Sequence, residues 1–381
     1  MVFNVSLKTM IAACVPSWGY LARERLMKRG VKTAAPARTT AARQGSYTLR
    51  VGYVPLLDCA PLIAAVELGV CRRNGLNIKL MRQPGWASIR DNVIFGELDA
   101  AHAPAGLLLA INAGLATVPA HCVTAFVFSQ QGNAITLSKR LYDRGIRDIA
   151  DLAQEARRRR EGEMLTLGVV SRYSTHAHLL RQWLRAGGIR PDRDARIVIL
   201  PPSQMAQSLA AGHIDGFCVG EPWNMVSVAS GEGWLAAHSS TLAPGHPEKV
   251  LMVRRDFAAQ RDAEHLALVA SLFEAAAWCA APANRAELAT LLQRRAFPAL
   301  ATRLISQSLA SDDAPIFHGQ DLHRPAPGKA SWLFDEMQRH GLLNGVAVAD
   351  AAPLEAFRPD LYDRALPPKT ATSPKAATTT H

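Results

Sequence analysis

The sequence predicts an α/β protein whose sheets are mostly parallel and are flanked by helices. Two observations lead to this fold class. Short runs rich in β-branched and aromatic residues recur along the chain, and segments of helical length separate them. Strands that alternate with helices in this way form parallel sheets, because each helix carries the chain back to the same edge. The length of 381 residues allows two domains of ordinary size.

The ordered part of the chain is predicted to begin near Ser46 with the strand Y-T-L-R-V-G-Y-V. Glycine and asparagine pairs mark the helix ends, as at Asn74-Gly75 and Gly187-Gly188. We predict strands at residues 47–54, 76–81, 98–101, 118–128, 134–137, 165–170, 197–200, 216–219 and 250–253. We predict helices at residues 61–72, 86–95, 105–112, 146–159, 175–186, 203–211, 263–281 and 286–293.

Composition and charge exclude several classes of protein. A hydrophobic content of 49% with 20% charged residues is typical of a globular chain. No apolar run approaches the roughly 20 residues that span a bilayer, which predicts no transmembrane segment. The net charge is +11, but the basic ends at 1–49 and 366–381 carry most of it, and the arginine run at 157–160 fits a solvated helix face. We therefore expect no direct binding of nucleic acid.

The cysteines and the N-terminus bear on the cellular location. Six cysteines show neither C-x-x-C nor paired spacing, so neither a zinc site nor a disulfide framework is expected, which favours a reducing compartment. Residues 11–14 resemble a lipoprotein cleavage box, but polar residues interrupt the segment before it. The prediction is a cytoplasmic protein, with a periplasmic or Cys14-anchored form as the alternative.

The motifs of nucleotide binding and of catalysis are missing from the sequence. There is no phosphate-binding loop, no G-x-G-x-x-G after a strand and no G-x-S-x-G elbow. His176 and His178 lie two apart and would point to different faces of a helix, which argues against a metal site. We predict no catalytic residues, no metal and no cofactor. Polar groups that follow predicted strands, where open α/β sheets bind ligands, suit the capture of a small anion instead.

Eight blocks of sequence carry a family resemblance. In order they are G-W-A-S-I-R-D-N (85–92), L-D-A-A-H (98–102), Q-G-N-A-I (131–135), H-A-H-L-L-R-Q-W-L-R-A-G-G-I (176–189), L-P-P-S-Q-M (200–205), D-G-F-C-V-G-E-P-W-N (215–224), H-P-E-K (246–249) and F-R-P-D-L-Y (357–362). This set resembles the nitrate/bicarbonate-binding (NrtA/CmpA/NasS-like) family of ABC-transporter substrate-binding proteins, nearest to its nitrate/nitrite-sensor branch. The resemblance departs at 103–107 and 324–337, which leaves the identity of the anion open.

The resemblance implies a two-lobed periplasmic-binding-protein (type 2, Venus-flytrap) fold with the anion in the cleft. It implies a basic extension at 1–45, a first lobe of 46–133 plus 254–365, a second lobe of 134–253 and a disordered tail at 366–381. The implied ligand-binding residues are Trp86, Gly132, Asn133, His176, Gly220, Pro222 and Lys249, and the supporting residues are His102, Glu221 and Trp223. Outside the family context, Trp86, His176 and Lys249 each also fit an ordinary core or surface role.

Three functions follow as hypotheses. The first is a nitrate or nitrite sensor that releases an ANTAR-domain (NasT-like) RNA-binding antiterminator when the anion binds. The second is the exported binding component of an ABC importer, with a permease as its partner, for nitrate, nitrite, bicarbonate or a sulfonate. The third is an enzyme of the same fold, similar to a pyrimidine-precursor synthase, which is disfavoured because the cysteine-rich motif C-C-C-F-C is missing.

Overall fold

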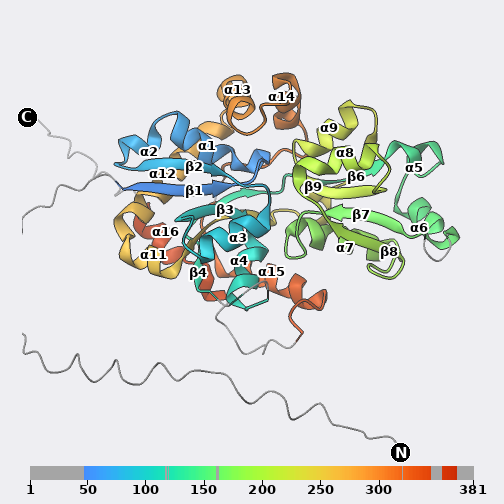
Figure 1. The fold of residues 1–381 in the computed structure, drawn as a ribbon, viewed down its shortest axis with the longest axis horizontal. Coiled ribbons are helices and arrows are strands. Elements are labelled where there is room, and N and C mark those ends of the chain that lie inside the picture. The colour runs from blue at the N-terminus through green and yellow to red at the C-terminus, as the bar shows by residue number, and fades with distance from the viewer. Residues whose placement is uncertain are drawn as a thin grey trace, which may run out of the picture. The chain divides into compact units, whose positions relative to one another are not determined.

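The protein contains two sheets, each covered by helices (Figure 1). The computed structural model describes residues 47–115, 118, 120–159, 163–319, 321–344 and 354–366. The described residues belong to one compact unit that begins at Ser46. The extension at 1–45, Cys14 and nearly all of the tail at 366–381 lie outside the described residues.

The first sheet has the order β2-β1-β3-β11-β4, with β5 also paired to β11. Its strands are β1 (Thr48–Tyr53), β2 (Asn77–Arg82), β3 (Ala100–Pro104), β4 (Cys122–Val123), β5 (Val127–Gln130) and β11 (Pro247–Arg254). β1 runs parallel to β2 and β3, whereas β11 runs antiparallel to β3, β4 and β5. The first lobe is this sheet with its covering helices.

Helices of the first lobe come from both ends of the chain. The early ones are α1 (Ala60–Glu67), α2 (Val70–Arg73), α3 (Trp86–Ile94) and α4 (Ala105–Asn112). The late ones are α11 (Arg255–Gln260), α12 (Asp262–Ala280), α13 (Arg285–Arg295) and α16 (Pro359–Ala365). α12 packs against α1 and α16. The helix predicted at 61–72 is divided in two because Gly69 adopts a left-handed conformation with φ of 71°.

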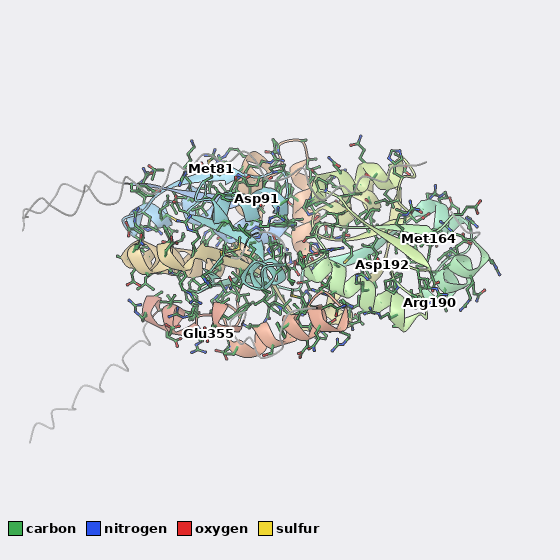
Figure 2. The ribbon with its side chains drawn as sticks, turned by 60° about the horizontal axis from the view of Figure 1, so that its bottom comes forward. Met81, Asp91, Met164, Arg190, Asp192 and Glu355 are labelled. Atoms are coloured by element: carbon green, nitrogen blue, oxygen red, sulfur yellow. The ribbon has the colours of Figure 1, made fainter. Side chains whose placement is uncertain are left out.

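The second sheet has the order β10-β6-β9-β7-β8. Its strands are β6 (Asn133–Ser138), β7 (Leu165–Val169), β8 (Ala195–Ile199), β9 (Gly216–Gly220) and β10 (Gly233–His238). Its helices are α5 (Lys139–Asp143), α6 (Ile149–Arg158), α7 (Thr175–Ala186), α8 (Met205–Ala210), α9 (Trp223–Ala229) and α10 (Ser239–Leu242). These elements form the second lobe. Figure 2 shows Met164, Arg190 and Asp192 on this lobe, with Met81 and Asp91 on the first.

The chain passes from the first sheet to the second between β5 and β6, and returns just before β11. Gln131, Gly132 and Gly245 all have positive φ at these crossings (58°, 92° and 71°). β11 had been predicted as part of the second lobe, but its pairing with β3 places it in the first sheet. The return crossing therefore lies near 246 rather than 253, because strand pairing rather than chain order assigns β11 to a sheet.

Besides α16, two α-helices of the described chain lie after residue 300. α14 (Thr302–Ala310) contacts α9 of the second lobe. α15 (Pro327–Arg339) contacts α4 of the first lobe and α7 of the second. The segment between them also touches the crossing, because a Cβ on Gly132 would lie about 3 Å from Pro315. The C-terminal part of the chain thus bridges the two lobes.

Two sequence-based expectations need adjustment. β10 was not predicted, and its half-buried residues explain why no strong strand pattern marks it. α12 is long and apolar enough by length and composition to cross a membrane, although no such segment was expected. Of its apolar window, 44% is buried inside the protein, and a core helix of a globular protein can pass the same test of length and composition.

Candidate functional site

A cluster of buried ionisable side chains lies where the two lobes meet. Asp58, His102, Glu248 and Lys249 come from the first lobe, and His176 comes from the first turn of α7 in the second. All five are at most 4% exposed. Charged groups are rarely buried unless they are paired or bind a ligand, so this cluster is the first place to look for function.

The strand register brings Lys249 and His102 to the same face of the first sheet. Antiparallel pairing sets Lys249 opposite Pro104 and Leu251 opposite His102, and residues two apart share a face. Asp58 follows the carboxyl end of β1 in the short 3-10 helix Leu57–Cys59. It joins the two, because its Oδ2 lies 2.8 Å from Lys249 Nζ and its Oδ1 lies 2.8 Å from His102 Nε2.

Glu248 connects Lys249 to the second lobe. The β11–β5 pairing is irregular between 247 and 250, and such a bulge re-aims side chains. Glu248 contacts Lys249 Nζ through Oε1, which also lies 3.2 Å from His176 Nε2. Its Oε2 accepts a hydrogen bond of 2.7 Å from Asn133 Nδ2. His246 Nε2 lies 3.6 Å from the same oxygen.

The pKa values of these groups fix their charges. Burial would raise the pKa of Asp58 and Glu248, but the nearby Lys249 ammonium together with the neighbouring histidines more than offsets it, so both pKa values fall and both groups are carboxylates. The same carboxylates raise the pKa of Lys249 despite its burial. Burial lowers the pKa of His102 and His176, which are therefore neutral near pH 7.

Trp86 supplies a hydrogen-bond donor without a partner at the edge of this cluster. It is 3% exposed, and its Nε1 finds no acceptor among the described residues. The Lys249 ammonium lies 5.5 Å from its ring, and the His102 ring lies 5.8 Å away. His176 Nδ1 and Asn133 Oδ1 are likewise buried without a hydrogen-bond partner in the described part of the chain. Buried polar atoms are normally satisfied, so these atoms point to a missing ligand.

A cavity of about 480 Å³ opens beside Trp86 between the lobes. The first lobe contributes the start of α3 and α4 to its wall, and the second contributes the segments after β7 and β8. Its lining is mainly apolar and includes Trp86, Arg90, Leu107, Arg172, Tyr173 and Pro201. Tyr173 also closes the junction, because its hydroxyl donates to Leu115 O at 3.0 Å.

The turn G-E-P-W at 220–223 fastens the second lobe to the first. Leu57 N donates to Glu221 O at 2.8 Å, and Trp223 Nε1 donates to Pro55 O at 3.1 Å. The Glu221 side chain accepts from Met225 N in α9 rather than reaching Lys249. The peptide bond before Pro222 is cis.

The structure places the predicted residues in two groups. Trp86, His102, Asn133, His176 and Lys249 lie in or against the buried cluster. Gly220 pairs with Asn133 and leaves room for it, since a Cβ there would lie 3.3 Å from Asn133 Oδ1. Gly132, Glu221, Pro222 and Trp223 shape the surroundings: Gly132 packs on Pro315, and the other three belong to the turn described above.

Sequence reasoning missed two members of the cluster, Asp58 and Glu248, and the neighbouring His246. Two signals were available in the sequence. Asp58 follows the first strand at its carboxyl end, and Glu248 and His246 both lie within the block H-P-E-K. Neither signal shows that these groups would meet His176 from the other lobe.

Comparison with known proteins places this architecture in a family. Residues 42–293 match the NMT1-like family. The chain belongs to the NMT1-like family. A structural match agrees with the assignment: the periplasmic nitrate-binding protein NrtA from Synechocystis PCC 6803 superimposes with a TM-score of 0.77 at 25% identity, over 84% of this chain and 88% of that protein. The fold is therefore the two-lobed periplasmic-binding-protein fold.

Curated relatives of this NMT1-like protein are named for the transport or the binding of small anions. The bicarbonate transport ATP-binding protein CmpC of Synechocystis is 38% identical over 82% of this chain and 49% of its own length. The nitrate/nitrite binding protein NrtA of Nostoc is 30% identical over 74% of this chain and 66% of its own. The chain thus spans about half the length of the first curated relatives that it matches. The similar binding proteins are named for binding rather than for turnover, in line with the prediction that this chain is not an enzyme.

The comparison corrects the predicted location. A cytoplasmic protein had been expected from the scattered cysteines and from the polar residues near the N-terminus. The similar NrtA structure is that of a periplasmic protein, so this expectation is wrong. Five described cysteines are free and buried, and burial raises the pKa of each thiol. Buried unpaired thiols of this kind pack as small apolar groups and therefore say little about the compartment.

Proposed function

We propose that this NMT1-like protein binds a small oxyanion, nitrate or nitrite, at the Trp86–Lys249 cluster and delivers it to an ABC importer. The observation that carries the proposal is the buried indole N–H of Trp86, a group that can only donate and has no acceptor in the described part of the chain. An anion oxygen would satisfy it beside the ammonium of Lys249, in a site from which water is excluded.

The charges of the cluster add a condition on binding. Asp58 and Glu248 are carboxylates and Lys249 is an ammonium, so the neutral imidazoles leave an excess of one negative charge. A bound monoanion therefore needs a proton, and His102 can take it. His102 faces Asp58 from the 3-10 helix, Glu248 and Lys249 from β11, and the rings of Trp86 and Phe128. The anion raises the pKa of His102, so affinity should fall as pH rises.

Closure of the lobes around the anion would give a partner protein a surface that it can recognise. Leu57 N, Pro55 O and Leu115 O on the first lobe all hydrogen-bond to groups of the second. An anion that contacts both Lys249 and His176 would favour this closed arrangement, because a ligand shifts the population toward the state it binds better. An ABC permease that recognises the closed form is the partner that this family role predicts. The names of the relatives give no support for release of an ANTAR-domain antiterminator.

The apolar cavity of about 480 Å³ favours a second candidate ligand, an organic sulfonate. Its oxyanion would lie against Trp86 and its tail would fill the space toward Leu107 and Pro201. Bare nitrate would leave that space to water.

Calorimetric titration with nitrate, nitrite, bicarbonate and a short alkanesulfonate tests these proposals, with chloride as the control anion. We expect nitrate or nitrite to bind, and to bind more tightly at pH 6 than at pH 8. Preference for the sulfonate would replace the first ligand with the second. If none of the four binds more tightly than chloride, the proposed function is wrong.

A further inference from the structure

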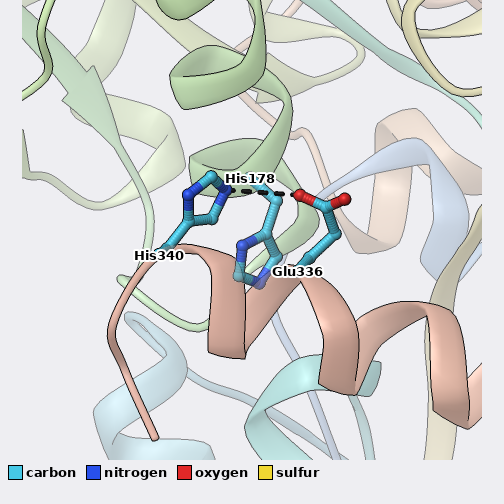
Figure 3. Close-up of side chains that lie close together, drawn as sticks. All are labelled: His178, Glu336 and His340. Carbon is cyan, nitrogen blue, oxygen red and sulfur yellow. Dashed lines mark ion pairs between the residues drawn. The ribbon is translucent and has the colours of Figure 1, made fainter. Parts of the chain in front are cut away.

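We propose that His178, Glu336 and His340 form a binding site for a divalent transition metal, Zn²⁺ above all, between α7 and α15. One ligand atom from each of these residues lies within 4.8 Å of the other two (Figure 3). His178 belongs to α7, whereas Glu336 and His340 are four apart on one face of α15 and its C-terminal cap. None of the three belongs to the anion cluster.

The second observation is that the candidate ligand atoms lack other partners. His178 is 1% exposed, and neither of its ring nitrogens has a hydrogen-bond partner among the described residues. Glu336 Oε2 and His340 Nε2 are also buried without a hydrogen bond in the described part of the chain, although they face each other at 3.3 Å. Leaving such atoms unpaired is costly, and a metal ion would bind one ring nitrogen of His178 together with Glu336 Oε2 and His340 Nε2.

The protonation states suit coordination. Burial lowers the pKa of His178 to about 3, so its imidazole is neutral and keeps a free lone pair. The pKa of Glu336 is lowered, since His340 and Arg339 outweigh the effect of burial, so it is a carboxylate. Two imidazoles with one carboxylate match the ligand set of open zinc sites. Zn–N distances near 2.1 Å require donors roughly 3.4 Å apart, so side-chain rotation must bring the three closer.

Neighbouring arginines decide which metal fits. Arg339 contacts Glu336 Oε1, and Arg185 contacts His340 Nδ1. One guanidinium paired with the single carboxylate, and a second beside one imidazole, disfavour Ca²⁺ and Mg²⁺, which rely on charged oxygen ligands. Zn²⁺ instead gains from the imidazoles. Coordination through His340 Nε2 requires its proton to sit on Nδ1, so the exposed Arg185 must turn away.

The proposed metal site lies where it would link the two lobes. His176 of the buried cluster lies in the first turn of α7, and α15 also contacts α4 of the first lobe. A metal held by both helices would tie the second lobe to the first independently of the anion.

The test is Zn²⁺ titration of the full chain by calorimetry, with Co²⁺ absorption to report the ligand type. Wild type should bind Zn²⁺ and show tetrahedral nitrogen/oxygen bands with Co²⁺, and binding should raise the melting temperature. His178→Gln and His340→Gln should weaken binding at least about 100-fold. His265→Gln is the matched control, because His265 is equally buried, lacks partners among the described residues and lies outside the cluster.

Arg185→Ala distinguishes metal ligands from residues that only stabilise the fold, because only a metal site predicts tighter Zn²⁺ binding in this variant. It removes the competing contact with His340 Nδ1 and should tighten Zn²⁺ binding. Equal Zn²⁺ affinity of wild type, His178→Gln and His340→Gln would overturn the proposal, as would weaker binding by Arg185→Ala. Circular dichroism of each variant ensures that lost binding is not lost folding.

Discussion

Replacing Lys249 by methionine removes the cation at the centre of the anion cluster while keeping most of the side chain's volume. Lys249 is completely buried and holds Asp58 at 2.8 Å together with Glu248. Its loss leaves two buried carboxylates without their cation. Removing one partner of a buried ion pair costs about 3–5 kcal/mol. For a chain of this size that corresponds to a fall in melting temperature on the order of 10 °C.

Lys139→Met is the matched control. Lys139 also pairs with a carboxylate, Asp143 at 2.6 Å, but both side chains are more than half exposed. Exposed pairs of this kind contribute about 0–1 kcal/mol. Thermal and urea unfolding should therefore separate the two variants clearly. If Lys249→Met is no less stable than Lys139→Met, the cluster is not the buried charge network described above.

Ligand binding distinguishes the role of Lys249 in folding from its role in the site. The double variant Lys249→Met/Glu248→Gln removes one unpaired carboxylate and should recover part of the stability. It should still fail to bind nitrate at temperatures where it is folded. Calorimetry measures this directly, and nitrate binding equal to wild type in either variant would remove Lys249 from the anion site.

Three further predictions follow from single residues. Trp86→Phe keeps an aromatic ring but removes the indole N–H, so anion affinity should fall about 10-fold while the stability of the ligand-free protein changes little. Trp234→Phe is the control: it removes another buried indole N–H without a partner in the described chain and should leave anion affinity unchanged. Gly106→Ala would place a Cβ 2.1 Å from Tyr173 O, so it should hold the lobes apart and weaken anion binding. Gly328→Ala is the control, because a Cβ there would meet nothing within 4 Å. Equal anion affinities of the two variants would contradict this account of closure. Burial raises the pKa of Glu221 to about 8 from 4.5, so the native state keeps a proton that the unfolded chain releases, and stability should fall as pH rises between these values by up to about 1.4 kcal/mol per pH unit. Urea unfolding from pH 5 to 7.5 should show a flatter slope for Glu221→Gln, and parallel slopes would show that the wild-type carboxyl is already ionised.

Local sequence patterns predicted most of the elements but not their pairing. Thr175–Ala186 and Ala105–Asn112 match their predicted bounds, because a cap or a proline marks the start of each helix. The antiparallel direction of β11 and the existence of β10 were not predicted. Neither strand carries a local signal for its direction, since pairing partners are more than 90 residues away in the sequence.

The arginine run at 157–160 shows that the sequence also does not reveal which charged side chains form ion pairs. It was predicted to be solvated, and Arg157 and Arg158 are exposed, but the Arg159 side chain is 16% exposed and donates to Asp215 at 3.0 Å. Asp215 is buried at the start of β9, and only the fold brings it next to the end of α6. Sequence spacing likewise argued against a metal at His178, because Glu336 and His340 lie about 160 positions further on and reach it only through the packing of α15 on α7.

By itself, the sequence determined the alternation of strands and helices, the ordered family blocks and five residues that meet at the lobe junction. Hydrophobic periodicity and turn residues depend on neighbours in the chain, so the sequence alone shows them. The tertiary structure alone decided that Asp58 and Glu248 contact Lys249 and that the turn at 220–223 joins the lobes. It also decided that the indole N–H of Trp86 has no acceptor among the described residues. These features depend on burial and on contacts between distant segments of the chain. Burial shifts the pKa values of the lysine, carboxylate and histidine groups and brings them into contact at the lobe junction.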